Sequence, residues 1–197
     1  PRTSSAASDV YKRQISGYLK GKKINLPKDK KTRPLKDMVK ESIFNILIHS
    51  NKIKFQIKNS EILDLFSGSG SFGLEFISRG AKKVYFNENY KEAIDILKKN
   101  IRILNCDDKS TLIEIDSFKI ENILKKLNKK FDLIFIDPPF KEEKINILLE
   151  IVLNLKILKN NGVIIIHRNK KINEVMTPNL NIIETRDYGI SKIILGN

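Results

Sequence analysis

The stretch with the clearest chemistry is Asp137, Pro138, Pro139 and Phe140, which follows the apolar run 131–136. Two consecutive prolines stiffen the backbone and remove two N–H donors, which leaves carbonyl oxygens as acceptors. Asp137 adds a carboxylate acceptor, and Phe140 adds a flat apolar face. Such a turn suits a planar group that donates N–H bonds, as a nucleobase with an exocyclic amine does. The alternative is a rigid strand-to-helix turn in which Asp137 caps the helix.

The same turn is suited to activating such an amine, which is a poor nucleophile because its lone pair is delocalised into the ring. Asp137 and the Pro138 carbonyl would hold both amine protons, localise the lone pair and aim it at an electrophile. The base would have to leave its stack, and Phe140 would replace the lost stacking, worth about 1–3 kcal/mol per base. The four residues of the turn, Pro139 included, are the predicted catalytic residues.

A glycine-rich loop, DLFSGSGSFG at 64–73, stands between an expected strand and an expected helix. In this context a backbone approaches a bound ligand closely. We expect a Cβ at Gly68 or Gly70 to obstruct that approach, and Gly73 to let the helix pack against the sheet. Glu88 lies about 20 residues after Gly68, where a carboxylate accepts hydrogen bonds from ribose hydroxyls. An adenosine-containing cofactor is predicted.

Two aspartates bear on which cofactor the loop holds. A nicotinamide dinucleotide would place its pyrophosphate on the helix N-terminus. Asp64 would repel a pyrophosphate and would suit an ammonium or sulfonium group, unless it only caps a helix or accepts a loop hydrogen bond. Asp116 ends the third expected strand, where it either accepts a hydrogen bond from an adenine amino group or caps the helix that begins near Phe118.

Short apolar strands alternate with helical segments along most of the chain. Strands are expected at 61–66, 83–86, 112–115, 131–136 and 163–167, and helices at 72–78, 91–104, 118–127 and 144–158. Continuous apolar strands between helices are typical of a parallel sheet that is covered on both faces. Segments 181–186 and 192–195 are typical of a closing antiparallel hairpin. We therefore predict an α/β fold with a mostly parallel seven-stranded sheet.

The N-terminal part differs from this pattern. Residues 1–14 are polar and lack an apolar period, so we expect a disordered tail or a sequence artefact. Residues 15–50 are expected to form a basic arm, as a short hairpin or extended segment at 15–33, and a helix over 37–49 with Asp37 at its cap. Residues 51–197 are expected to form the main domain.

The composition bounds the function classes. The chain has 197 residues and a net charge of +14, from 37 Lys+Arg against 23 Asp+Glu. That charge favours a polyanionic partner such as a nucleic acid, although a drift of composition toward Lys, Asn and Ile would produce it too. Its lone Cys106 and its two histidines favour a reducing cytosol and no metal centre. The longest apolar runs fall far short of the roughly 20 residues that a membrane helix needs.

Together, the loop DLFSGSGSFG, Glu88, Asp116 and DPPF resemble a class I S-adenosylmethionine-dependent methyltransferase that modifies exocyclic amino groups. Upstream, GYLKGKKINLP and TRPLKDMVKESIFNIL resemble the N-terminal arm and first helix of RsmD-type bacterial enzymes, which methylate N2 of a guanine in small-subunit ribosomal RNA. SRGAKKVYFNEN continues the likeness, which covers about 15–197. The resemblance implies a Rossmann-like fold, S-adenosylmethionine as cofactor and ribosomal RNA or the small ribosomal subunit as partner. We also expect a cytoplasmic monomer.

The resemblance also assigns site residues. It places the methionine moiety at the loop around Asp64, the ribose at Glu88, the adenine at Asp116 and the target guanine at 137–140. The residues expected to hold the cofactor are Asp64, Phe66, Gly68, Gly70, Glu88, Asn89, Asp116 and Ser117.

Phosphate contacts are expected at the start of the first helix. Arg33, Lys36 and Lys40 are the predicted RNA-binding residues, because the helix they introduce is basic on one side; a solvated lysine face is the alternative. The chain departs from the family's usual pattern at Leu35, Met38, Tyr90 and Ile166, the last preceding His167. We expect His167 to be a satisfied strand-end histidine rather than a catalyst.

The function predicted from these residues is methyl transfer, by in-line displacement at sulfonium, to guanine N2 in small-subunit ribosomal RNA. A DNA adenine-N6 methyltransferase is the nearest alternative, because the same turn accepts either amine. A catalytically silent RNA-binding assembly factor and a nicotinamide dehydrogenase are the others. The lack of a sizeable target-recognition segment favours RNA over DNA, and the intact 137–140 turn and Glu88 count against a silent protein.

Overall fold

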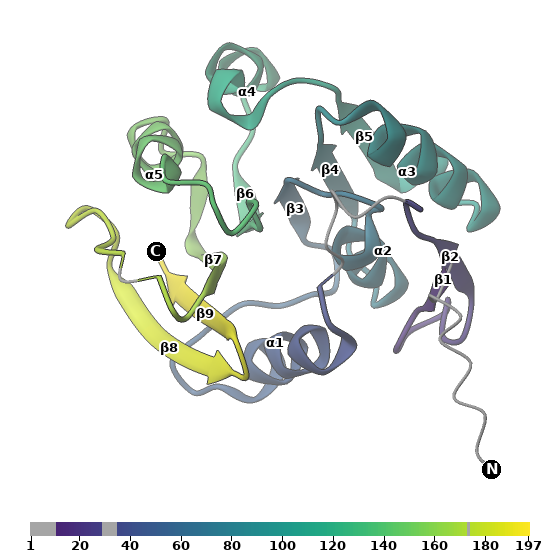
Figure 1. The fold of residues 1–197 in the computed structure, drawn as a ribbon, viewed down its shortest axis with the longest axis horizontal. Helices are drawn as coiled ribbons and strands as arrows, with labels where there is room; N and C mark the ends of the chain where they lie inside the picture. The colour runs from purple at the N-terminus through teal and green to yellow at the C-terminus, as the bar shows by residue number, and fades with distance from the viewer. Residues whose placement is uncertain (1–10, 29–34, 173) are drawn as a thin grey trace.

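The centre of the protein is a twisted seven-stranded sheet, seen in a computed structural model that describes residues 11–28, 35–172 and 174–197 (Figure 1). The order of its strands is β5-β4-β3-β6-β7-β9-β8. The strands are β3 (Glu61–Leu65), β4 (Lys83–Asn87), β5 (Ser110–Ile113), β6 (Phe131–Ile136), β7 (Leu158–Asn169), β8 (Ile182–Tyr188) and β9 (Ser191–Gly196). β3 to β7 pair in parallel, whereas β9 runs antiparallel between β7 and β8. The predicted fold class is confirmed, including the antiparallel C-terminal hairpin.

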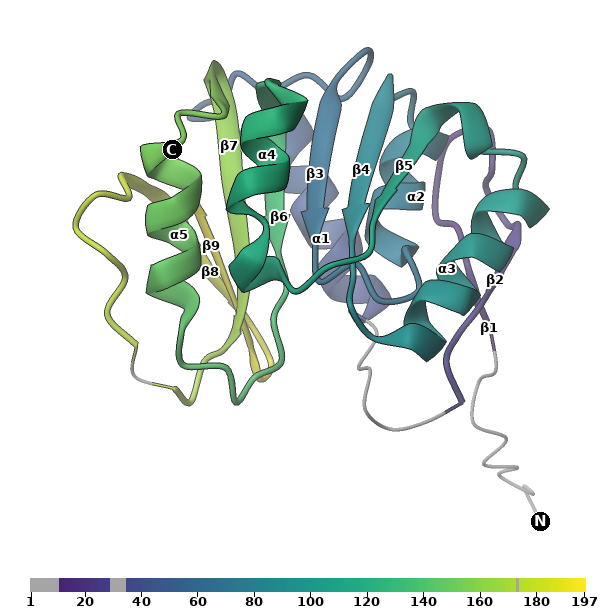
Figure 2. The ribbon, with the colours of Figure 1, turned by 90° about the horizontal axis from the view of Figure 1, so that it is seen from above.

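Helices cover both faces of the sheet, with α4 and α5 on one side and α1 and α2 on the other (Figure 2). The helices are α1 (Asp37–His49), α2 (Ser71–Ser78), α3 (Lys91–Ile103), α4 (Glu121–Leu127) and α5 (Ile145–Asn154). Successive residues of a strand point to opposite faces, so Ile62 packs in the cluster with α1, α2 and α3, and Leu63 packs in the cluster with α4 and α5. This burial on both faces explains why the apolar runs in the sequence are continuous.

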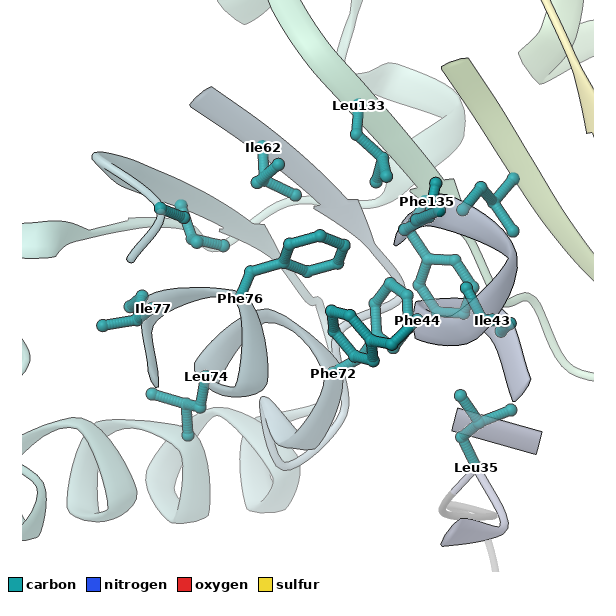
Figure 3. Packing of buried hydrophobic residues seen from close by; sticks show 14 of the residues in the cluster. Leu35, Ile43, Phe44, Ile62, Phe72, Leu74, Phe76, Ile77, Leu133 and Phe135 are labelled. Atoms are coloured by element: carbon teal, nitrogen blue, oxygen red, sulfur yellow. The ribbon is translucent and has the colours of Figure 1, made fainter. Parts of the chain in front are cut away.

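Aromatic rings join α1 and α2 to the sheet (Figure 3). The ring centre of Phe72 lies 3.8 Å from that of Phe135 on β6, and Phe44 of α1 lies 4.6 Å from Phe76 of α2. All four side chains are buried. Such pairs add about 0.5–1.5 kcal/mol each beyond the area that they bury. The same rings therefore fix how the glycine loop, which precedes α2, sits against the end of β6.

The N-terminal arm forms a two-stranded antiparallel hairpin of β1 (Tyr11–Arg13) and β2 (Lys23–Asn25). A hairpin was among the predicted forms of 15–33, but its first strand lies before residue 15. The expectation that 1–14 is a disordered tail is thus wrong for 11–14, because 11–13 pair with β2 and Gln14 is buried. Residues 1–10 lie outside the described part of the chain.

Buried polar side chains hold this hairpin on α2 and α3. Glu75 of α2 accepts hydrogen bonds from the backbone N–H groups of Ile15 and Ser16, both at 2.8 Å. Asn100 of α3 accepts one from the backbone N–H of Asn25 at 2.7 Å. A buried carboxylate needs such donors, because burying it without them costs several kcal/mol. The hairpin therefore supplies partners that α2 and α3 require.

Two helix ends differ from the prediction. α5 ends at Asn154 rather than at 158, because Lys156 adopts a left-handed backbone (φ 50°) and β7 begins at Leu158. α1 does begin at Asp37, but the capping position belongs to Lys36, so Asp37 is not the cap. Its carboxylate instead accepts a hydrogen bond from Lys12 at 3.1 Å, which ties the hairpin to α1.

The crossover from β5 to α4 also differs from the prediction. The third parallel strand, Ser110–Ile113, lies two residues earlier than expected. The helix expected over 118–127 starts as a 3-10 turn, Ser117–Lys119, and becomes α-helical only at Glu121. Within the described ranges no helix is long and apolar enough to cross a membrane.

The close approach of α2 to the sheet depends on the missing side chain of Gly73. A Cβ at this position would lie 2.3 Å from the ring of Phe86 and 2.8 Å from Val84. We expect Gly73→Ala to lower the free energy of unfolding by about 1–3 kcal/mol, because overpacking forces side chains to shift. Urea denaturation measures the loss. In the Gly73→Ala/Phe86→Leu double variant the losses should be less than additive; full additivity would contradict the packing explanation.

Candidate active site

A cavity of about 750 Å³ opens at the carboxyl ends of the central strands. Successive connections lead from β3 to β4 and β5 on one side and then to β6 on the other, and ligands bind at this kind of switch point in open α/β sheets. Most of the predicted site residues line it: Lys36, Asp64, Phe66, Gly68, Glu88, Asn89, Asp116, Asp137, Pro138, Pro139 and Phe140. The predicted residues Gly70, Ser117 and Lys40 do not line it, and Arg33 lies outside the described residues.

Asp64, near the end of β3, is a buried carboxylate at this cavity. Its Oδ2 accepts a hydrogen bond from the backbone N–H of Gly73 at 3.1 Å, whereas its buried Oδ1 has no partner among the described residues. Burial, followed by the charges of Asp137 and Glu88, raises the pKa of Asp64 well above its ordinary value of 3.8. An unpaired acceptor in such a place suits a cationic donor such as an ammonium group.

A side chain at Gly68 and one at Gly70 would meet different surroundings. Gly68 has a φ of 56° and faces open space, as expected of a residue beside a ligand. Gly70 has a φ of 78°, but its Cβ would meet Leu97 of α3 at 2.3 Å. The expectation that a Cβ at Gly70 obstructs the ligand is therefore wrong, because that Cβ would enter the core. Phe66 also has a positive φ, 60°, which is strained for a bulky residue and often marks a functional loop.

Glu88 braces the glycine loop from the end of β4. Its Oε2 accepts a hydrogen bond from the backbone N–H of Gly68 at 2.8 Å, and its Oε1 accepts those of Asn89 and Tyr90 at 2.9 Å each. These bonds hold the carboxylate at the cavity, where ribose hydroxyls would share its oxygens. The ribose contact of Glu88 and the role of Asn89 stay predictions.

Asp116 has a capping role that the sequence left open. Its Oδ1 accepts a hydrogen bond from the backbone N–H of Phe118 at 3.0 Å, so the cap is confirmed, and the adenine contact stays a prediction. The expected cofactor contact of the Ser117 side chain is not supported, because this buried hydroxyl bonds to Asn87. Asn87 also donates to the carbonyls of Ile113 and Ile115, which holds the ends of β4 and β5 together.

Asp137 is held by a side chain from the neighbouring strand. Its Oδ1 lies 2.7 Å from Nδ1 of His167 on β7, and Nε2 of His167 lies 2.8 Å from Oγ of Ser191 on β9. Asp137 does not cap a helix, because α5 begins after Lys144 and has no side-chain cap bond. The capping alternative for Asp137 is therefore wrong. His167 is indeed satisfied, but its partner is the carboxylate of the predicted catalytic turn.

Arg168 holds the rest of the turn and was not predicted from the sequence. Its buried guanidinium donates to the carbonyl of Glu142 at 2.6 Å and to that of Pro139 at 3.4 Å. The backbone N–H of Glu142 also donates to the Pro139 carbonyl, at 2.8 Å. Glu174 balances the charge of Arg168 at 2.6 Å. The Pro139 carbonyl is thus occupied inside the protein, although both prolines contribute to the cavity wall.

Of the two lysines predicted to contact phosphate, one is buried and the other is exposed. Lys40 is fully buried and donates to Oγ of Ser71 at 3.2 Å, and burial lowers its pKa. Its expected contact with phosphate is therefore wrong, because no part of this side chain reaches the surface. Lys36 is exposed at the cavity. Two exposed lysines that were not predicted, Lys141 and Lys144, join it there; their place directly after the 137–140 turn was the available signal.

The cavity is not a recognisable metal centre. In the part of the chain that the structure describes, histidine, cysteine and carboxylate side chains form no group of three or more that could hold a metal ion.

Comparisons with known proteins agree with this arrangement. The model of a protein family described as Conserved hypothetical protein 95 matches residues 12–197. Ribosomal RNA small subunit methyltransferase D of Buchnera aphidicola subsp. Baizongia pistaciae is 35% identical over 91% of this chain and 87% of its own length. The protein of the same name from Haemophilus influenzae is 32% identical over 96% and 94%. A solved structure from Haemophilus influenzae covers 94% of this chain and 97% of its own, with a TM-score of 0.73 and 30% identity. The sheet therefore has the class I methyltransferase fold.

The raised pKa of Asp64 predicts a pH-dependent change in stability. A carboxyl group whose folded-state pKa is raised stabilises the fold at low pH, and this contribution is lost as the pH rises through the folded-state pKa. Asp64→Asn cannot ionise, so we expect its Tm to exceed that of the wild type increasingly between pH 4 and pH 8, by roughly 2–4 °C for each kcal/mol gained.

Thermal denaturation across that pH range measures the difference between the two proteins. Asp187→Asn, at an exposed position on β8, is the matched control and should show no such trend. An Asp64→Asn variant that loses stability relative to the wild type as the pH rises would contradict the assignment.

Proposed function

The chain belongs to the family described as Conserved hypothetical protein 95, and from this premise we propose that it transfers a methyl group from S-adenosylmethionine to N2 of a guanine in small-subunit ribosomal RNA. Relatives named ribosomal RNA small subunit methyltransferase D support the broader part of the proposal, methylation of ribosomal RNA with this cofactor. The choice of guanine N2 rests on the chemistry of the cavity and on the resemblance of its motifs.

One observation carries the proposal: a buried carboxylate, one of whose oxygens has no partner among the residues described, and an acceptor-rich turn line the same cavity from adjacent strands. Asp64 is paired in register with Phe135 of β6, two residues before Asp137. The backbone N–H of Asp137 also donates to the carbonyl of Leu65, the residue after Asp64, at 3.3 Å, so the two carboxylates come from neighbouring strand ends. A cationic methyl donor beside Asp64 would thus lie next to any amine that Asp137 holds.

The fit to the cofactor follows from the residues that line the cavity. Asp64 Oδ1 would accept a hydrogen bond from the ammonium of the methionine moiety. Glu88 would bind the ribose, and the rings of Phe66 and Phe118, whose centres lie 5.9 Å apart, would contact the adenine near Asp116. When bound, S-adenosylmethionine supplies an electrophilic methyl group on its sulfonium. The acidic side chains of the cavity would favour that positive charge.

The turn would hold the target amine. Asp137 and the Pro138 carbonyl would each accept one of the two N2 protons, which leaves the nitrogen lone pair directed at the methyl group. Phe140, half-buried at the cavity, would stack on the extruded base. The N2 proton becomes acidic only after the nitrogen has attacked, so Asp137 need not be a strong base. The lysines at 36, 141 and 144 would contact the flanking phosphates.

The test of the proposal is the methylation of ribosomal RNA. Small-subunit RNA from cells that lack this protein should lose one N2-methylguanosine, which mass spectrometry of nuclease digests detects. The purified protein should restore it on subunits from those cells with S-adenosylmethionine. Methylation of adenine in DNA instead, or an unchanged set of N2-methylguanosines, would refute the assignment.

The two carboxylates should separate cofactor binding from transfer. We expect Asp137→Ala to slow methyl transfer by about 10²–10³-fold, because an acceptor that orients the reacting group is lost, with the affinity for S-adenosylmethionine nearly intact. Asp64→Asn should weaken that affinity by about tenfold or more, since about 1.4 kcal/mol corresponds to tenfold. Calorimetry and single-turnover kinetics measure both quantities, and Asp187→Asn again serves as the control. Equal loss of affinity in both variants would contradict these roles.

A further inference from the structure

The catalytic turn is connected to two buried side chains that the proposed reaction does not use. His167 and Ser191 have exposed fractions of 6% and 4%. They continue a line of hydrogen bonds from Asp137 Oδ1 to His167 Nδ1, and from His167 Nε2 to Ser191 Oγ. Asp137 follows the end of β6, His167 lies on β7 and Ser191 lies on β9. In the sheet, β7 lies between β6 and β9. The histidine therefore bridges the turn and the C-terminal hairpin.

The carboxylate of Asp137 sets the tautomer of the ring. An ionised carboxylate only accepts hydrogen bonds, so the His167 nitrogen that faces Asp137 must carry a proton. In a neutral ring, Nε2 is then an acceptor, and the Ser191 hydroxyl donates to it. The opposite tautomer would set a ring lone pair against the carboxylate at 2.7 Å. The Ser191 hydroxyl, which can donate or accept, satisfies Nε2 in the form of His167 that Asp137 requires.

The bond to His167 also fixes how Asp137 presents its second oxygen. Within the described residues no hydrogen bond uses Oδ2, and Asp137 lines the cavity. The ring of Phe140 meets His167 edge-on, with centres 5.3 Å apart and planes at 73°. This contact restricts the imidazole and places the predicted stacking ring relative to the same histidine. A carboxylate that is held at one oxygen loses little rotational freedom when the other oxygen binds an amine.

We propose that His167, kept in its Nδ1–H form by the Asp137 carboxylate and held at Nε2 by Ser191, is a positioning residue that directs Oδ2 of Asp137 at the substrate amine. The inference rests on the proposed function, because the amine is the one that is methylated. His167 keeps its Nδ1 proton throughout. The proton that leaves the methylated nitrogen is taken up by Asp137 Oδ2 and passes from there to solvent. The role of the histidine is orientation, with no proton of its own transferred.

A matched pair of amide variants tests this role. The side-chain amide of Asn can place an N–H where Nδ1 lies, whereas the longer Gln side chain places it where Nε2 lies. We expect His167→Asn to keep the single-turnover rate of methyl transfer within about tenfold, and His167→Gln to lose about 10–100-fold, as supporting hydrogen-bond partners typically cost. The affinity for S-adenosylmethionine, measured by calorimetry, should be unchanged in both. Equal rates in the two variants, or a faster Gln variant, would overturn the proposal.

A second measurement does not depend on activity or on the stability of a histidine variant. The ¹⁵N chemical shifts of the His167 ring should report the Nδ1–H tautomer in the wild type, and Asp137→Ala, which removes the carboxylate acceptor, should shift the ring toward a mixture with the Nε2–H form. A wild type in the Nε2–H form would refute the positioning role even if the protein methylates ribosomal RNA. A wild type in the Nδ1–H form that methylates no guanine would refute the proposed function alone.

Discussion

The site depends on a buried carboxylate, Asp64, that lines the same cavity as a second carboxylate, Asp137, from the end of the neighbouring strand. Burial, followed by the charge of Asp137, raises the pKa of Asp64 and so the cost of ionising it. The two carboxylates differ in their partners. His167 donates to Asp137, whereas Asp64 keeps one buried oxygen without a partner in the described structure. A cation bound in the cavity would offset that cost by favouring the ionised form of Asp64. The electrostatic cost of the empty site is therefore also the source of its selectivity for a positively charged ligand.

Holding these charges in place requires rigid strand ends, and the chain supplies them with side chains that bond to backbone. Asn87 bridges the ends of β4 and β5, Glu88 holds the glycine loop, and Arg168 holds the turn after Asp137. Each is a buried or half-buried polar group whose hydrogen bonds are satisfied within the fold. The aromatic rings of Phe72 and Phe135, which line the same cavity, stack on each other. The cavity is thus organised before any ligand binds, which limits the entropy that binding must overcome.

Much of this could be predicted from the sequence, because it follows from local rules. Continuous apolar runs between helical periods predict a parallel sheet, and such a sheet brings Asp64, Glu88, Asp116 and Asp137 to one edge. What could not be predicted depends on which strands become neighbours and on what covers them. The bond between Asp137 and His167 needs β6 beside β7, and the burial of Lys40 needs α1 packed beside α2. Gly70 was singled out for the wrong reason, since only the packed position of α3 shows where its Cβ would point.

The division of charge between the inside and the outside of the cavity connects the two ligands of the proposed reaction. The chain as a whole carries +14, yet the cavity wall is lined by Asp64, Glu88, Asp116 and Asp137, while exposed Lys36, Lys141 and Lys144 lie beside them. A polyanion is attracted to such lysines through its phosphates but is repelled from the acidic interior. A single neutral base can enter where the phosphates cannot, so the electrostatics themselves favour an extruded nucleotide over an intact helix. The acidic interior then serves the cation that the base must meet.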